Sequence, residues 1–223
     1  MLRSLGDPFS FVVLVFSFVV AVTLHGWVQS LLADRAGNPQ PRAEGRRSPD
    51  PRSHLDPFGA VAGAIAGMGW SRPLDGQARR DRSALLTVFL LPALLNIVVG
   101  LGALFVLGLL TTVGVTSPSL LLQLGVAGAD LGQRALLLFG VMQLYVGALS
   151  LVPVPPLDGG RLLFGLAPRS IGWQKAEHQL VDRNIGLVAL LVLLLLPLGG
   201  PQALLPLVMD DLLGPLVRLV TGG

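Results

Sequence analysis

The stretch "FVVAVTLHGWVQSLLADRAG", residues 18–37, combines the long apolar run of a membrane helix with two polar side chains. His25 lies about seven residues before the predicted end of this span at Leu32, or about 10 Å into the membrane at 1.5 Å per residue. Gln29 follows one helical turn later, so the two side chains share a face. Because polar side chains at this depth are costly, they indicate either hydrogen bonding to a neighbouring span or a functional site.

The composition is that of an integral membrane protein. The chain has 223 residues, of which 52% are hydrophobic and 13% charged, whereas a soluble domain carries roughly a quarter charged residues. The absence of cysteine excludes disulfides and thiolate metal sites. The Arg-rich segment is short, interrupted by proline and tethered to membrane spans, so no nucleic-acid partner is expected.

Hydrophobicity predicts an all-α membrane protein with about four transmembrane helices. A bilayer core of about 30 Å needs roughly 20 apolar residues, and four segments come close: 9–32, 84–110, 134–152 and 185–198. The fourth is short and needs tilt or extension. Residues 117–130 are predicted to be re-entrant or interfacial. We expect a single membrane-embedded domain over residues 1–200 and an interfacial amphipathic tail over 201–223.

Basic residues predict the orientation. Nine of the sixteen lysines and arginines fall between residues 34 and 83, and four more between 153 and 184. The positive-inside rule therefore places both loops in the cytoplasm and makes the chain a multi-pass protein of the cell membrane. The first loop begins with a stretch rich in Pro, Gly and Arg, which is predicted to be mobile rather than folded.

The second polar feature is "LSLVPVPPLDGGRLL", residues 149–163. Its three prolines end the third span and favour an extended break; they are Pro153, Pro155 and Pro156. Extended backbone inside a membrane must be covered by protein or line a wet cavity, so Asp158 is expected to face the interior. The alternative is a plain turn residue, because Asp-Gly is a common turn pair. The first and third spans end on the same side, so His25 and Asp158 are predicted to converge, as in a metal site.

Together these stretches resemble the site-2 protease family, intramembrane zinc metalloproteases, in its short bacterial form. Family members carry HExxH in an early span and LDG after a Pro-rich break, and the matching stretches here are "LHGWVQS" and "SLVPVPPLDGGR". "RSHLDPFGAVAGAIAGMGWSRP" resembles the family's His-x-Asp-Pro and Gly-Trp-x-x-Pro segments, and "FLLPALLNIVVG" its Ala-Gly-Pro…Asn span. The resemblance covers roughly residues 9–165 and implies a site-2-protease-like core.

The resemblance implies that His25 and Asp158 occupy zinc-ligand positions. Gln29 stands where the second histidine ligand is expected, and Gly26 where the catalytic glutamate is expected. Glycine cannot accept a proton, and a general base typically contributes about 10²–10⁴-fold. A neutral amide is poorly matched to zinc beside imidazole, and two strong ligands are too few for a tight site. Zinc is therefore the implied cofactor, but we expect a weakly metallated or empty site without protease activity.

The resemblance also implies a groove for a transmembrane segment of another protein. It would be bordered by Asn96, Ser150, Pro153, Pro155 and Pro156. The alternative for Asn96 and Ser150 is hydrogen bonding between spans.

The remaining histidines are predicted to lie at the surface. His54 is expected to be a surface or capping residue before Asp56, with a role as substitute ligand as the alternative. His178 is expected on a solvated helical face.

Three functions are compatible with these observations. The leading hypothesis is a catalytically degenerate site-2 protease homologue that binds a membrane segment or partner. The second is an active metalloprotease with an altered ligand set, using His25, Asp158 and either Gln29 or His54. The third is a structural membrane bundle whose resemblance to the family is only ancestral.

Overall fold

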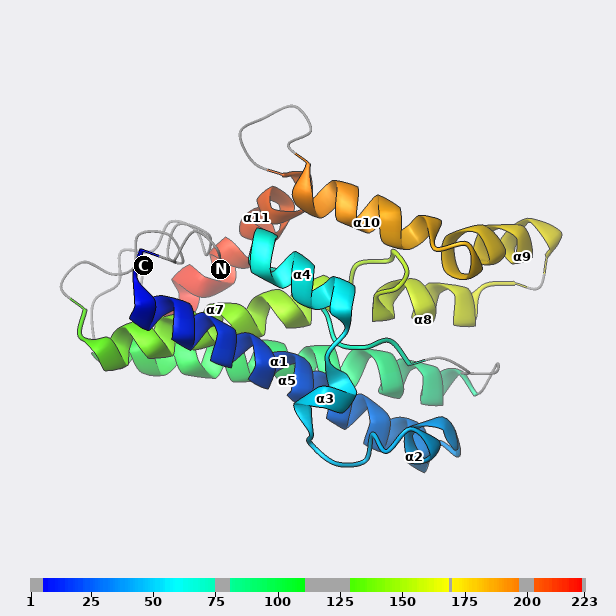
Figure 1. The fold of residues 1–223 in the computed structure, drawn as a ribbon, viewed down its shortest axis with the longest axis horizontal. Coiled ribbons are helices and arrows are strands. Elements are labelled where there is room, and N and C mark those ends of the chain that lie inside the picture. The colour runs from blue at the N-terminus through cyan, green and yellow to red at the C-terminus, as the bar shows by residue number, and fades with distance from the viewer. Residues whose placement is uncertain (1–5, 75–80, 111–128, 169, 197–202, 222–223) are drawn as a thin grey trace.

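Three long apolar helices form the centre of the molecule: α1 (Pro8–Arg35), α5 (Arg82–Leu110) and α7 (Leu131–Ser150). The structure is a computed structural model, and it describes residues 6–74, 81–110, 129–168, 170–196 and 203–221. Each of the three is long and apolar enough to cross a bilayer, and α5 lies against both α1 and α7 (Figure 1). The described residues form one isolated bridge and no β-strand. The prediction of an all-α membrane protein is therefore confirmed.

Two of these helices begin at side-chain caps. The Asp7 side chain accepts a hydrogen bond from the Ser10 backbone N–H at 3.3 Å and caps α1. Asp130 and Gln133 form a reciprocal capping box at the start of α7. Such caps satisfy backbone N–H groups that have no partner inside the helix. They explain why both helices begin before the predicted spans.

Glycines allow α5 and α7 to approach closely. A Cβ atom on Gly100 would lie 2.8 Å from the carbonyl oxygen of Gly140, and one on Gly147 would lie 2.7 Å from that of Ala93. Small residues are enriched where membrane helices pack, because apolar side chains gain little by leaving lipid. Van der Waals contact between the backbones therefore holds this pair of helices together.

The fourth predicted span is a bent helical segment. The helix α10 (Ile185–Leu195) has only 11 residues. It follows α9 (Ile171–Glu177) and the π-helical turn η2 (His178–Asp182), with a bend of 64° near Asn184, which has a left-handed backbone. Among the described residues, three helices are therefore long and apolar enough to span a membrane, or four if the bent pair is one span. His178 is exposed, as predicted, and contacts Asp182 at 2.8 Å.

The Pro-, Gly- and Arg-rich stretch that begins the Arg-rich loop, residues 35–53, is folded, so the prediction of a mobile segment is wrong. It contains α2 (Gln40–Ala43) and most of α3 (Pro51–His54), and α4 (Pro57–Ala66) follows. Arg46 is 0% exposed and donates to the carbonyl oxygens of Arg72 at 2.8 Å and Pro73 at 3.1 Å. The loop is also joined to α1, because the Trp27 indole N–H donates to the Arg47 carbonyl at 2.9 Å. The composition of the stretch indicated that Arg46 is exposed to solvent. Its guanidinium is buried instead, because backbone carbonyls from residues distant in the sequence accept its hydrogen bonds.

Substitution of Arg46 by alanine is expected to loosen this loop. It removes two charge-assisted hydrogen bonds and leaves a cavity, at a cost of about 3 kcal/mol. We expect faster limited proteolysis in the loop and a lower melting temperature in detergent. Arg52→Ala, at an exposed arginine of the same loop, is the matched control and should behave like the parent chain. Equal proteolysis of the two variants would contradict a structural role for Arg46.

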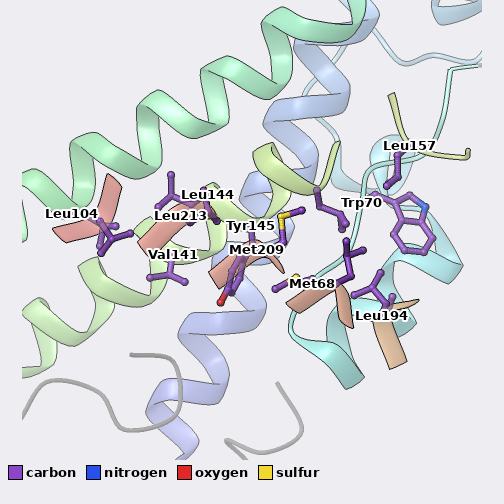
Figure 2. Packing of buried hydrophobic residues seen from close by; sticks show 14 of the residues in the cluster. Met68, Trp70, Leu104, Val141, Leu144, Tyr145, Leu157, Leu194, Met209 and Leu213 are labelled. Atoms are coloured by element: carbon purple, nitrogen blue, oxygen red, sulfur yellow. The ribbon is translucent and has the colours of Figure 1, made fainter. Parts of the chain in front are cut away.

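The last described helix, α11 (Leu204–Thr221), packs into the main core. Figure 2 shows Met209 and Leu213 of α11 beside Tyr145 and Leu144 of α7. The Tyr145 hydroxyl donates to the Asp210 carboxylate at 2.8 Å. One face of α11 is thus buried, while the division into a domain over 1–200 and a tail over 201–223 stays a prediction. The segment predicted at 117–130 lies almost entirely outside the described residues.

Candidate functional site

Helix α1 presents His25 and Gln29 on one buried face. His25 is 1% exposed and Gln29 0%. The two residues lie four positions apart in an unbroken helix of 28 residues, so their side chains project one above the other. Both reach Asp158, the first residue of α8 (Asp158–Leu166).

The Pro-rich break and two glycines position Asp158. After α7 ends at Ser150, residues 151–157 form irregular turns, and the chain then folds back on them. A Cβ on Gly159 would lie 2.2 Å from the Leu151 carbonyl oxygen, and one on Gly160 would lie 2.4 Å from the Pro155 nitrogen. Only glycine permits this contact between backbones. The "DGG" sequence is therefore a packing requirement as well as a turn.

The three polar side chains form a closed hydrogen-bonded cluster. His25 Nε2 lies 2.6 Å from Asp158 Oδ2, and the Gln29 amide donates to Asp158 Oδ1 at 2.7 Å. A carboxylate only accepts hydrogen bonds, so each of its oxygens receives one donor from α1. The structure thus brings His25 and Asp158 together and adds Gln29 as a second partner of the same carboxylate.

His54 is buried beside this cluster, so the prediction of a surface residue is wrong. Its side chain is 0% exposed, and its Nε2 bonds the Ser48 carbonyl oxygen at 2.9 Å. A Cβ placed on Gly26 would meet His54 Nδ1 at 2.8 Å. Burial lowers the pKa of His54, and nearby Arg46 lowers it further, against the opposing effect of the Ser48 hydrogen bond. The neutral ring donates from Nε2 to a carbonyl, which leaves Nδ1 as an acceptor.

No periodicity or composition distinguishes His54 from a surface histidine. His54 stands two residues before Asp56, whose side chain caps α4 by accepting from the Gly59 N–H. A surface histidine would fit this local pattern equally well. Arg161 was also not identified from the sequence. Its guanidinium donates to the carbonyl oxygens of Leu74 at 2.7 Å and Pro156 at 3.3 Å, and so ties the break to the loop.

The residues predicted to border a groove have mixed environments. Asn96 is buried, and its amide donates to the carbonyl oxygen of Ala21, one turn before His25, at 3.1 Å. The buried Ser150 hydroxyl donates to Val146 within its own helix at 2.7 Å. Pro153 is exposed, Pro156 half-buried and Pro155 buried. Asn96 thus makes the hydrogen bond between helices given as its alternative role, whereas the Ser150 bond lies within one helix. The groove itself stays a prediction, and Pro153 is the exposed residue of the five.

The donor set does not fit zinc in this arrangement. Two atoms bound to one tetrahedral zinc lie about 3.3 Å apart, since each bond is about 2.0–2.1 Å. The 2.6 Å contact between His25 and Asp158 is a direct hydrogen bond, and Gln29 turns its N–H rather than its oxygen toward the cluster. Within the described part of the chain, no three His, Cys, Asp or Glu side chains are placed to hold a metal.

Three buried atoms around the cluster lack hydrogen-bond partners among the described residues: His25 Nδ1, Gln29 Oε1 and His54 Nδ1. Where each ring donates from Nε2, all three atoms are acceptors. Beside the Asp158 carboxylate, the site therefore offers three buried acceptors.

The chain was compared with known proteins. No family model and no solved structure matches it. It is 28% identical over 190 residues to the Bacillus subtilis (strain 168) protein named "Putative zinc metalloprotease YwhC". The match covers 84% of this chain and 82% of that protein. Over most of its length, the chain is thus similar to a protein named as a zinc metalloprotease.

Proposed function

We propose that the chain is a site-2 protease homologue that has lost its hydrolytic centre and binds a membrane segment of a partner instead of cutting it. One observation carries the proposal: the carboxylate at the third ligand position is occupied by hydrogen bonds from His25 and Gln29. A metal ion would have to break both bonds and would gain only two strong ligands. The missing base at Gly26 supports the same conclusion.

The rest of the molecule is consistent with this proposal. The similarity to a protein named as a zinc metalloprotease extends over most of the chain, and three or four apolar helices provide the membrane setting. Zinc, if present, would be weakly held. We further propose a multi-pass protein of the cell membrane with residues 34–83 in the cytoplasm, on the basis of the positive-inside rule.

Zinc content and cleavage test the loss of the hydrolytic centre. The full chain, purified in detergent, is expected to hold far less than one zinc per chain after dialysis. In vesicles it should leave a single-span test segment intact, as should His25→Ala. Stoichiometric zinc that His25→Ala removes, together with chelator-sensitive cleavage, would instead establish the active metalloprotease with an altered ligand set.

Binding is tested separately. A photo-crosslinking residue at the exposed Pro153, within the Pro-rich break, should capture a single-span segment reconstituted in the same vesicles. The same residue at Leu109, which is 71% exposed at the far end of α5, is the matched control and should capture lipid only. Equal capture at both positions would favour the structural bundle, which has no specific partner.

A further inference from the structure

A hydrogen bond marks the middle of the spanning helices. Asn96, the fifteenth of the 29 residues of α5, donates to the carbonyl oxygen of Ala21, the fourteenth of the 28 residues of α1. Gly147 of α7 lies at the same level, because a Cβ on it would be 3.1 Å from the Asn96 Cβ. Tyr145 is two residues, or about 3 Å along the helix, from Gly147. Because the Tyr145 hydroxyl donates to Asp210, this part of α11 lies near the middle of the spans.

From that level α11 runs beside α5 toward the end of the bundle. A Cβ on Gly108 of α5 would lie 2.9 Å from the Cα of Thr221, the last residue of α11. Thr221 follows Asp210 by eleven residues, and Gly108 follows Asn96 by twelve, so the two helices cover the same length in the same direction. The exposed side of α11 therefore lies at the depth of the spanning helices and faces the membrane.

This exposed side of α11 is apolar around one carboxylate. Asp211, next to Asp210, is exposed, whereas its neighbours Met209 and Leu213 are buried in the core. The exposed residues that surround Asp211 on the helix are aliphatic, and together with it they form the outer face of α11: Leu207, Val208, Leu212, Leu216 and Leu219. A carboxylate in the middle of a spanning region is costly, and such groups are almost always paired or face a protein interior.

The chain itself offers Asp211 no cation. Within the part of the chain that the structure describes, Asp211 forms neither an ion pair nor a side-chain hydrogen bond. Arg218, the other exposed charge of α11, follows seven residues later, about 10 Å along the axis, and its long side chain reaches toward the interface at the helix end. Residues 111–128 and 197–202 contain no lysine or arginine.

We propose that the outer face of α11 docks a transmembrane segment of another protein that carries a lysine or arginine near its middle, paired with Asp211. A second copy of this chain does not meet the need. Two chains with the same orientation in the membrane are related by an axis along its normal, which places Asp211 beside its own copy, and like charges repel. A cation on a different segment at the same depth gives charge complementarity, and the aliphatic side chains around Asp211 give the apolar contact.

This docking face goes beyond the proposed function. It depends on the depth of α11 and on the charge of Asp211, and not on the Pro-rich break or on the loss of the hydrolytic centre. Stoichiometric zinc in the unmodified chain would therefore overturn the proposed function and leave the docking face standing.

Association in vesicles tests the pairing. The full chain, labelled through Arg52→Cys and reconstituted in phosphatidylcholine vesicles, is titrated with two labelled single-span leucine–alanine peptides, one with lysine and one with leucine at its centre. Energy transfer should show that the lysine peptide associates about tenfold more tightly. Asp211→Asn should abolish this preference. Asp182→Asn, at an exposed carboxylate of η2, is the matched control and should keep it.

A charge reversal separates pairing from damage to the fold. Asp211→Lys should lose the lysine peptide and bind a peptide with a central glutamate, and neither variant at position 211 should change the melting temperature in detergent, because Asp211 makes no side-chain contact of its own in the described residues. Equal association of the lysine and leucine peptides with the parent chain would overturn the proposal. A lysine preference that survives in Asp211→Asn would overturn it as well.

Discussion

Gly160→Ala is expected to be the most damaging single substitution at the break before α8. The added methyl group would lie 2.4 Å from the Pro155 nitrogen and 2.5 Å from the Val154 carbonyl carbon. Both are backbone atoms and cannot rotate aside, so the start of α8 must move. Overpacking of this kind costs about 3 kcal/mol or more. The movement would also withdraw Asp158 from His25.

Unfolding by heat or denaturant in detergent measures this effect, together with the yield of folded protein. Gly165→Ala is the matched control in the same helix, because its Cβ would meet only the flexible methyl groups of Leu85, at 3.3 Å and 3.5 Å. We expect Gly165→Ala to stay near the parent. If the two alanines have the same effect, the tight packing of α8 on the break does not position Asp158.

Asp158→Ala is expected to have the second largest effect. It leaves the His25 Nε2 and the Gln29 amide without an acceptor inside the protein, where the cost of an unpaired donor is high. A buried donor left unsatisfied costs about 1–3 kcal/mol, and this substitution leaves two of them. Asp158→Asn keeps one acceptor oxygen and should lie between the parent and the alanine variant.

The same chain contains a matched control at its surface. His178 and Asp182 form an equivalent contact of 2.8 Å, but their side chains are 57% and 63% exposed. Exposed pairs of this kind contribute about 0–1 kcal/mol, so Asp182→Ala should hardly change the unfolding midpoint. Similar losses for Asp158→Ala and Asp182→Ala would show that the buried cluster does not stabilise the link between α1 and α8.

The hydrophobic pattern predicted the three spanning helices well, because each is a long apolar run and membrane helices satisfy their own backbone. The fourth predicted span was harder to describe from the sequence. Residues 185–198 look like one short apolar segment, whereas the bend near Asn184 joins α10 to more polar turns before it. Periodicity cannot detect a bend that depends on a single left-handed residue.

The meeting of His25 and Asp158 could be anticipated, because two helices that end on the same side bring their last turns to the same level. The hydrogen-bond partners of His25 and Asp158 could not be predicted in the same way. Gln29 was identified as a weak ligand, but only the structure shows that its amide N–H faces Asp158. Arg46 was assigned to a mobile stretch and His54 to the surface, and both are buried.

The amino-acid sequence by itself determined the long apolar helices and the end of α7 before the prolines, since these depend on local hydrophobicity and backbone restriction. The extended conformation predicted for the prolines was wrong, because residues 151–157 form turns. Only the tertiary structure decided what occupies the site. The His25–Asp158–Gln29 cluster and the His54 ring over Gly26 arise from contacts between segments separated by up to 133 residues. Such contacts depend on how helices and loops pack in space, and no local pattern encodes them.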